Sequence, residues 1–193
     1  MALDKHVFVS SGKSFRKAVS ALDNGEHFVL QMKDIEQKEN GVQINYDGLV
    51  KTNIESKKPL SFLQKGDVII ATTGAKRNAF VFDGYPEKMV ATQHFLILRA
   101  KDPLALSAHF VASVINMPSS QTWLNQYSSG SYQSMLSVKL LSKLPFPTMT
   151  KIEQEQFLKL ETEVTEEKAI LLKLIEQRET QLASLLSEYI SND

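Results

Sequence analysis

The chain has 193 residues, of which 42% are hydrophobic and 23% charged, values that fit one globular domain with or without an appended element. It contains no cysteine, which excludes disulfide bonds, cysteine-ligated zinc and a cysteine nucleophile. Its net charge of zero conceals an asymmetry: residues 1–150 carry 17 basic and 12 acidic side chains, whereas residues 151–193 carry 5 and 10. A basic globule can face a polyanion while an acidic helix stays away from it, although long exposed helices are also often rich in glutamate.

The start of the chain does not resemble a targeting signal. Residues 1–11 lack the basic start and the long apolar run of a signal peptide. Uninterrupted apolar stretches elsewhere are only a few residues long, too short to cross a bilayer. We therefore expect a cytoplasmic protein without a membrane segment.

In the first 145 residues, short runs rich in valine, isoleucine and phenylalanine alternate with turn signals, a pattern typical of a half-buried sheet. The expected strands lie at 27–32, 42–45, 67–72, 79–82 and 95–99. Three helices are also expected, one before these strands and two after them. The first, at 13–22, places Phe15, Ala18, Val19 and Leu22 on one face. The second runs from Pro103 to about Asn116, and a short third helix runs from Ser119 or Ser120 to Tyr127.

Pro145 and Pro147 interrupt this pattern, and the chain from 151 to about 190 is helical in character, without glycine or proline. About 40 residues at 1.5 Å each make a rod of roughly 60 Å, longer than the preceding domain needs for its own packing. We expect its apolar stripe to pair with a second helix, with Lys168 and Arg178 interrupting the seam and setting its register. The alternative is a helix that folds back on its own domain. The expected dimerisation residues are Phe157, Val164, Leu171, Leu174, Ile175, Leu182 and Leu185.

Known catalytic motifs are missing or incomplete. Ser11-Gly12-Lys13-Ser14 resembles the end of a phosphate-binding loop, but that motif requires glycine where Val7 stands. The four histidines lack zinc-hydrolase spacing, and there is no Gly-x-Ser-x-Gly elbow and no Gly-x-Gly-x-x-Gly loop. We expect no catalytic residue, no metal and no cofactor. A small enzyme with scattered catalytic residues stays open as a third alternative.

Several short motifs occur in a characteristic order. In the first hundred residues they are Ser10-Ser11-Gly12, Gln31-Met32-Lys33-Asp34-Ile35, Lys65-Gly66-Asp67, Thr73-Gly74 and Thr92-Gln93-His94. Further along they are Ser129-Gly130-Ser131, Leu136-Ser137, Leu144-Pro145-Phe146-Pro147 and Glu153-Gln154. Each is weak alone, but together they resemble the target-recognition domain of type I restriction-modification specificity subunits and the start of its spacer helix. Full subunits of that family resemble two such units in tandem, so this chain resembles half of one.

The resemblance implies a mixed α/β fold, with a β-rich DNA target-recognition domain and peripheral helices over 1–147 and a long coiled-coil helix over 148–193. It implies a non-catalytic, sequence-specific DNA-binding specificity subunit that serves DNA methylation and phage defence. A homodimer formed through the helix would bind double-stranded DNA. Its partners would be a DNA methyltransferase subunit and, where the system has one, a restriction subunit. The alternative is a coiled-coil adaptor for protein interactions that does not bind DNA.

DNA recognition requires lysine or arginine at phosphates and asparagine, glutamine, arginine, serine or threonine at base edges. The richest such loop contains Thr72, Thr73, Lys76, Arg77 and Asn78, and a second group contains Lys51, Thr52, Asn53, Lys57 and Lys58. A third contains Ser128, Ser129, Ser131, Tyr132 and Gln133, and Gln93 and His94 could join at a strand edge. Two structural alternatives stay open: Lys57-Lys58 as a solvated loop, and Thr92-Gln93-His94 as a segment that bonds the sheet interior.

Overall fold

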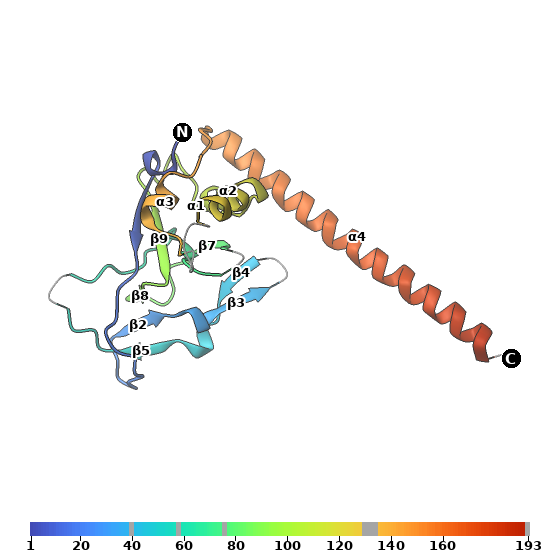
Figure 1. Cartoon of the computed structure of the whole chain (residues 1–193), viewed down its shortest axis with the longest axis horizontal. Helices are drawn as coiled ribbons and strands as arrows, with labels where there is room; N and C mark the ends of the chain where they lie inside the picture. The colour runs from blue at the N-terminus through green and yellow to red at the C-terminus, as the bar shows by residue number, and fades with distance from the viewer. Residues whose placement is uncertain (39–40, 57–58, 75–76, 129–134, 192–193) are drawn as a thin grey trace. The chain divides into compact units, whose positions relative to one another are not determined.

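The computed structural model describes residues 1–38, 41–56, 59–74, 77–128 and 135–191. The chain divides into two units, Met1–Lys151 and Ile152–Asp193. The first unit is a mixed α/β assembly of three sheets and short helices, and the second is a single long helix (Figure 1). This is the predicted fold class.

A four-stranded antiparallel sheet runs through the first unit. Its strands, in spatial order, are β1 (Val7–Ser11), β9 (Phe95–Ala100), β6 (Val68–Ala71) and β7 (Ala79–Val81). The central strands β9 and β6 carry the apolar runs Phe-Leu-Ile-Leu and Val-Ile-Ile, which are buried without alternation. Continuous apolar runs of this length are typical of strands covered on both faces. The strands predicted at 67–72, 79–82 and 95–99 are thus confirmed.

A second sheet and a hairpin complete the β structure. The sheet contains β5 (Val50–Thr52), β2 (His27–Leu30) and β8 (Met89–Ala91), and the hairpin contains β3 (Ile35–Lys38) and β4 (Gly41–Ile44). β2 pairs antiparallel with β5 and parallel with β8. Leu30, Ile44 and Met89 share one buried cluster with Ile69 and Phe80 of the four-stranded sheet. The apolar core therefore joins all three sheets.

Short helices follow the strands. They are α1 (Ala108–Asn116), α2 (Pro118–Ser128) and α3 (Val138–Ser142), with single 3-10 turns η1 (Leu3–Lys5), η2 (Met32–Asp34) and η3 (Tyr46–Gly48). η2 ends the strand predicted at 27–32, which stops at Leu30. α1 packs against β7 and β6, and the amide of Asn116 bonds both backbone groups of Ala79 at the outer edge of β7 (2.7 and 2.8 Å). The Asn116 side chain therefore satisfies backbone groups of the edge strand β7 that would otherwise pair with another strand.

The helix predicted from Pro103 begins later than expected. Ser107 caps α1 by accepting a hydrogen bond from the backbone N–H of Phe110, so the first helical residue is Ala108. Pro103 lies in the preceding turn, where Asp102 Oδ1 accepts from the N–H of Leu104 (3.0 Å). The Asp102 carboxylate thus stabilises a turn at Pro103, where the sequence predicted the first turn of the helix.

The segment between β1 and β2 is irregular, so the helix predicted at 13–22 is wrong. We call residues 12–25 the strap. Its backbone bonds to other segments: Lys13 N–H donates to Ala91 O (2.8 Å), and Leu22 N–H donates to Lys51 O (2.9 Å). These long-range bonds use backbone groups that a helix would have paired internally.

A glycine stands at each crossing of the strap. A Cβ on Gly12 would lie 2.1 Å from the carbonyl oxygen of Thr92, and a Cβ on Gly25 would lie 2.4 Å from the backbone nitrogen of Thr52. Such distances leave no room for a side chain, so glycine is required for the close backbone approach. The strap is therefore fixed at one end to the segment after β8 and at the other to β5.

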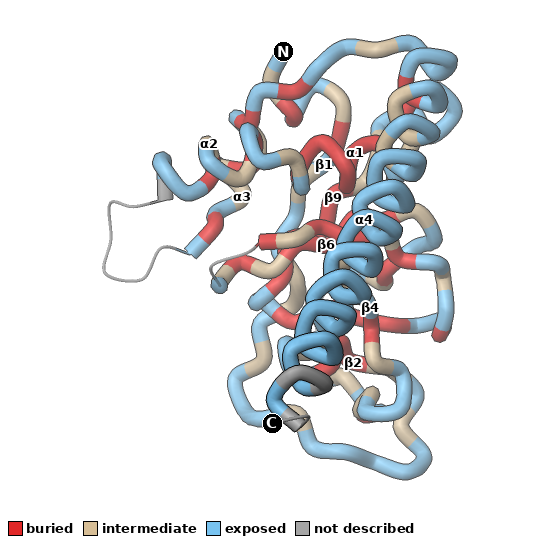
Figure 2. The backbone as a smooth tube through the Cα atoms, turned by 90° about the vertical axis from the view of Figure 1, so that its right-hand side faces the viewer, coloured by how far each residue is buried: buried red, intermediate tan, exposed pale blue. Residues whose placement is uncertain are grey.

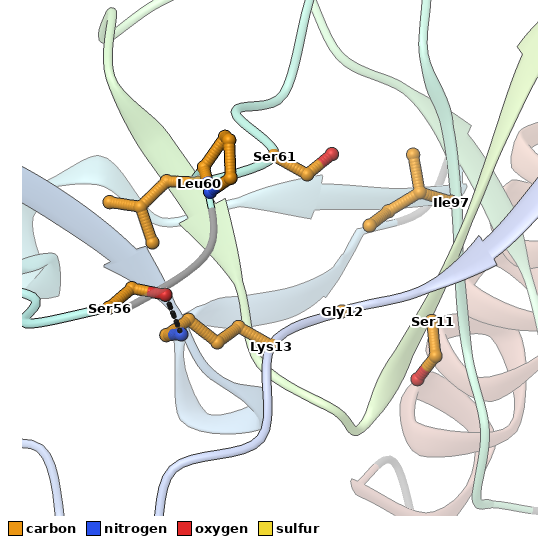
Figure 3. A pocket seen from close by; sticks show the side chains of 8 residues that line it. Ser11, Gly12, Lys13, Ser56, Leu60, Ser61 and Ile97 are labelled. Atoms are coloured by element: carbon orange, nitrogen blue, oxygen red, sulfur yellow. Dashed lines mark hydrogen bonds between the residues drawn. The ribbon is translucent and has the colours of Figure 1, made fainter.

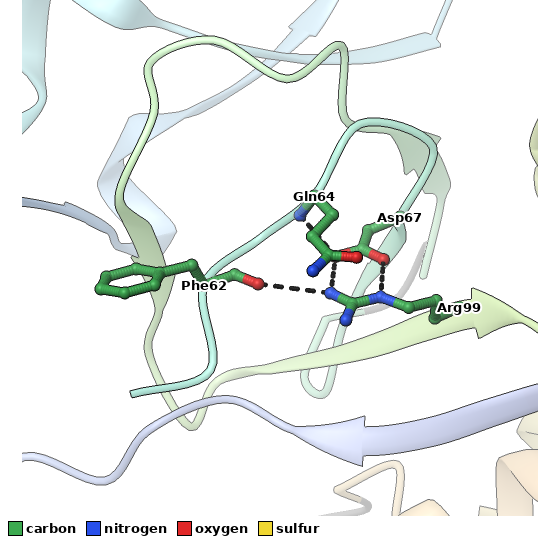
Figure 4. A network of polar contacts seen from close by, with 4 residues as sticks. All are labelled: Phe62, Gln64, Asp67 and Arg99. Atoms are coloured by element: carbon green, nitrogen blue, oxygen red, sulfur yellow. Dashed lines mark hydrogen bonds and ion pairs between the residues drawn. The ribbon is translucent and has the colours of Figure 1, made fainter. Parts of the chain in front are cut away.

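The predicted motif Lys65-Gly66-Asp67 forms a turn held by an ion pair (Figure 4). Arg99 donates from Nε and Nη2 to the two carboxylate oxygens of Asp67, both at 2.7 Å. The same carboxylate accepts from the N–H of Gln64, and Arg99 also reaches the carbonyl of Phe62. Asp67 is only 1% exposed, so this motif has a structural role in linking the turn to β9.

The second unit is α4 (Lys151–Ser191), a helix of 41 residues that confirms the helix predicted from 151 to about 190. Its apolar stripe is open to solvent, with Leu174 47% and Leu182 68% exposed, whereas Phe157 is half-buried. Figure 2 shows exposed residues along nearly all of α4, in contrast to the buried strands β6 and β9 of the first unit. No helix among the described residues is long and apolar enough to cross a membrane.

Candidate nucleic-acid interface

A tight turn at Thr92, Gln93 and His94 connects β8 of one sheet to β9 of another. Thr92 N–H donates to Leu30 O, which extends the parallel pairing of β2 and β8, and Phe95 N–H donates back to Thr92 O, which closes the turn (both 3.0 Å). Thr92 is buried by this arrangement, whereas Gln93 and His94 are exposed. The turn thus presents two polar side chains outward on a backbone held from both sides.

The strap crosses this turn and fixes the position of Lys13. Gln93 N–H donates to Lys13 O (2.9 Å), while the Lys13 N–H is bound to Ala91 and the Gly12 N–H to Phe95 O (2.9 Å). Both backbone groups of Lys13 are therefore occupied, and its side chain leaves a defined point next to Gln93. This cation was not among the predicted site residues.

The strap, η2 and the turn enclose a groove of about 610 Å³, which we call the basic groove. Its lining consists of Lys13, Phe15, Lys17, Ala18, Val19, Gln31, Met32, Lys33, Thr73, Thr92, Gln93 and His94. Three lysines contribute positive charge, and none of the described residues that line it is acidic. Phe15, Val19 and Met32 add an apolar surface to the groove. The groove combines cations, amide and hydroxyl groups and apolar contacts, which are the side-chain types that contact nucleic-acid backbones and base edges.

One polar atom of the groove lacks a partner. The side chain of Thr92 is only 6% exposed, and its Oγ1 makes no hydrogen bond to any described residue. A buried hydroxyl without a partner is costly, so its presence calls for an explanation. Thr92 can donate and accept a hydrogen bond, and it lies beside the exposed Gln93 and His94.

The structure brings together Thr73, Gln93 and His94 of the predicted DNA-contact residues, all of which line the basic groove. Thr72 and Arg77, by contrast, are each only 2% exposed. Thr72 bonds His94 O through both its N–H (2.8 Å) and its Oγ1 (3.1 Å), and burial lowers the pKa of Arg77. The side chains of Thr72 and Arg77 therefore lie within the fold in this structure, and the neighbouring Asn78 is half-buried.

The second predicted group lies at the other end of the strap. Lys51 is exposed on β5, where its Nζ lies 4.9 Å from the ring centre of Phe28, a cation–π distance. Asn53 is exposed, and its Oδ1 accepts from the N–H of Glu26 (3.0 Å). Thr52 of this group is 9% exposed. The remaining predicted residues lie outside the residues, or the side chains, that the structure describes: Lys57, Lys58, Lys76, Ser128, Ser129, Ser131, Tyr132 and Gln133.

Sequence reasoning missed Lys13, Lys17 and Lys33: the first two lay in the expected helix at 13–22, and the third followed the strand expected at 27–32. A usable signal was present. Between Gly12 and Leu22 the chain carries Lys13, Arg16 and Lys17 without an acidic residue, in a protein whose net charge is zero. Such a local excess of cations is typical of a polyanion-binding segment as well as of a solvated loop. The described residues form no group of three or more His, Cys, Asp or Glu that could hold a metal ion.

No protein-family model matches the sequence, and no significant match to a curated protein was found. Solved structures do match. The HsdS subunit from Thermoanaerobacter tengcongensis superposes with a TM-score of 0.60 over 89% of this chain at 14% identity. The S subunit of a type I restriction-modification system from M. genitalium gives 0.51 over 91% at 19% identity. A chain from a study of complex assembly and conformational transition of the type I R-M system gives 0.58 over 95% at 15% identity.

These matches share the fold of this chain from the first strands into the long helix. They confirm, at the level of the fold, the resemblance to type I specificity subunits. Each covers 38 to 42% of the solved chain, so this chain spans about two fifths of the length of the proteins it resembles.

Proposed function

We propose that this chain is a non-catalytic DNA-specificity module of a type I restriction-modification system. The observation that carries the proposal is the fold shared with S subunits over about nine tenths of the chain. The basic groove supports it independently, because a concave surface lined by three lysines and by exposed glutamine and histidine suits a DNA backbone and base edges. The excess of basic residues before residue 151 adds attraction for a polyanion.

Two copies pair through α4 in this proposal. The stripe that includes Val164, Leu171 and Ile175 is about half exposed at each position, and an exposed apolar stripe on a long helix is stabilised by a partner helix. A two-fold dimer presents two identical heads and therefore reads a symmetric, bipartite site. The dimer positions a DNA methyltransferase subunit on that site, and a restriction subunit where the system has one.

The first test is binding to duplex DNA as a function of salt. Fluorescence anisotropy with random-sequence duplex should show micromolar to submillimolar affinity that falls steeply with salt. Replacing Lys17 and Lys33 with glutamine should reduce the slope of log K against log salt by about 0.9 for each phosphate that the variant no longer neutralises. Lys139→Gln, which removes one charge from α3, is the control for net charge and should leave the slope nearly unchanged.

The adaptor hypothesis predicts a different result. A globular head on a coiled-coil helix that binds only proteins would show no salt-dependent association with duplex DNA, and the lysine variants would behave like the wild type. That outcome would reject the specificity function and leave the exposed stripe of α4 as the surface to study.

A further inference from the structure

A second, smaller hollow lies on the strap side of β9. It encloses about 280 Å³ and is lined by Ser11, Gly12, Lys13, Ser56, Pro59, Leu60, Ser61 and Ile97. Figure 3 shows Lys13 reaching from the strap toward Ser56, with Leu60 and Ser61 on a neighbouring segment. We call it the serine–lysine pocket. Lys13 lines both this pocket and the basic groove, so the two hollows share this residue.

The hydrogen bonding of the pocket leaves donors available. Lys13 Nζ donates to Ser56 Oγ at 3.1 Å, which is the bond that fixes the ammonium group in the pocket. An ammonium has three N–H donors, and this bond to Ser56 uses one of them; Ser56 accepts the bond, so its own hydroxyl proton can point to another acceptor. Ser11 and Ser61 also line the pocket.

The charge of the pocket selects the ligand. Among the described residues that line it, one is cationic and none is acidic. A site with an ammonium beside a serine hydroxyl suits a ligand that is anionic and accepts hydrogen bonds at several oxygens, as a phosphate group does. A volume of about 280 Å³ can hold such a group together with several waters, each of which occupies roughly 30 Å³.

The segment Ser11-Gly12-Lys13-Ser14 is not a phosphate-binding loop of the nucleotide-binding kind. In such a loop, backbone N–H groups cradle the phosphates. Here the N–H groups of Gly12 and Lys13 donate to Phe95 O and Ala91 O and are not available. The donors are therefore side chains, of which Lys13 Nζ is directed toward Ser56 by their hydrogen bond.

We propose that the serine–lysine pocket binds a phosphate group through Lys13 and Ser56, and that in the bound complex this is a backbone phosphate of the DNA in the basic groove. Binding of a DNA phosphate at this pocket rests on the proposed function. Binding of a phosphate group as such does not, because a free phosphate has the same chemistry.

The first experiment uses inorganic phosphate and the full chain. Titration followed by amide NMR should shift the resonances of Lys13, Ser56 and Ser61 in the wild type and not in Lys13→Gln. Lys13→Arg keeps the charge and should retain part of the response, and Lys139→Gln should respond like the wild type. Thermal unfolding of each variant shows whether it is folded. Shifts that persist unchanged in a folded Lys13→Gln variant would overturn the pocket.

The second experiment uses duplex DNA. Lys13→Gln should weaken cognate and random duplexes alike, by about tenfold, and lower the salt slope by about 0.9 per head. One methylphosphonate substitution, which neutralises a single phosphate, should weaken the wild type but not Lys13→Gln.

The two experiments separate the two claims. Phosphate shifts without any DNA binding would support the pocket and reject the proposed function. If Lys13→Gln binds DNA with unchanged affinity and salt slope, the pocket does not hold a DNA phosphate, while the proposed function stands.

Discussion

Thr92 is a single residue at which the stability of the fold and the proposed binding can be tested separately. Its hydroxyl is buried at the edge of the basic groove and has no hydrogen-bond partner among the described residues. An unsatisfied buried hydroxyl costs about 1–3 kcal/mol. Valine has nearly the same shape as threonine and lacks the polar atom, so the two contributions of the hydroxyl can be separated at this position.

We expect Thr92→Val to raise the free energy of unfolding by about 1 kcal/mol and to lower the affinity for the cognate site. Chemical denaturation measures the first change, and competition between cognate and random duplexes measures the second. Because Oγ1 would contact a base edge or a phosphate only in the complex, the two changes have opposite signs. If the variant gains stability and its DNA affinity is unchanged, Thr92 does not contact the DNA.

Asp67 stabilises the fold, because its buried carboxylate accepts hydrogen bonds from Arg99 and from the N–H of Gln64. We expect Asp67→Asn to lower the free energy of unfolding by about 2–3 kcal/mol, since it breaks a bidentate pair in which one partner is buried. Lys38→Gln removes an ion pair between exposed side chains, with Glu36, and should change stability little. Equal losses in denaturation curves of the two variants would contradict a structural role for this turn.

Residue type alone did not reveal which polar side chains face solvent. Thr72 and Arg77 are of the right type for DNA contact but are buried, while Gln93 and His94, in a turn of equally plausible composition, are exposed. The difference arises from tertiary bonds such as that between Thr72 and His94 O, which no local pattern encodes. Gln93 and His94 were predicted as DNA contacts, and both are exposed because they lie in the turn between β8 and β9.

At the scale of the element, the strap depends on the absence of a side chain at Gly12. We expect Gly12→Ala to destabilise the fold by about 1–3 kcal/mol, because its Cβ would overlap the carbonyl of Thr92 and the strap would have to move away. The same movement displaces Lys13 from the basic groove, so DNA affinity should fall as well. Gly48→Ala is the matched control, since its Cβ would have only one neighbour, Asp34 Oδ1, at 3.7 Å. If both variants unfold at the same temperature, the crossing is not tight.

The central strands β6 and β9 could be predicted and the strap could not, for a physical reason. β6 and β9 are long enough in apolar, β-branched and aromatic residues for local composition to indicate them. The strap carries apolar residues at helical spacing, yet its backbone bonds go to Ala91 and Lys51, which are distant in sequence. β8, with three residues, is too short for a pattern and is defined by its parallel pairing with β2.

The proposed dimer depends on the apolar stripe of α4. We expect Leu171→Asp combined with Leu182→Asp to weaken dimerisation more than about a thousandfold, because each buried leucine contributes about 1.5–3 kcal/mol and appears twice in a two-fold pair. Ala169→Asp adds one negative charge to the same helix off the stripe and is the control. Light scattering over a range of concentrations measures the effect. A wild-type monomer would reject the dimer, and a double variant that stays dimeric would place the interface elsewhere.

At the scale of the whole chain, opposite charges are carried by different parts of the sequence, with a net charge of +5 before residue 151 and −5 from there on. A head that binds DNA benefits from its positive charge, whereas a helix that binds another helix does not need to approach the phosphates. The two functions can therefore be separated experimentally. The position of the cut matters, because Leu144 and Phe146 are buried in the first unit, where the Phe146 N–H donates to Met1 O (2.7 Å).

A shortened chain that ends at Lys151 keeps these residues and removes nearly all of α4. We expect it to be a folded monomer with the salt slope of a single head on random duplex. On a bipartite site selected from random sequences by the full chain, it should bind at least about a hundredfold more weakly, since the second head no longer acts at high effective concentration. Gel-shift titration on the complete site and on one half-site measures this difference. Equal affinities of the two chains for the complete site would mean that each head binds alone, and α4 would then serve a partner other than a second copy.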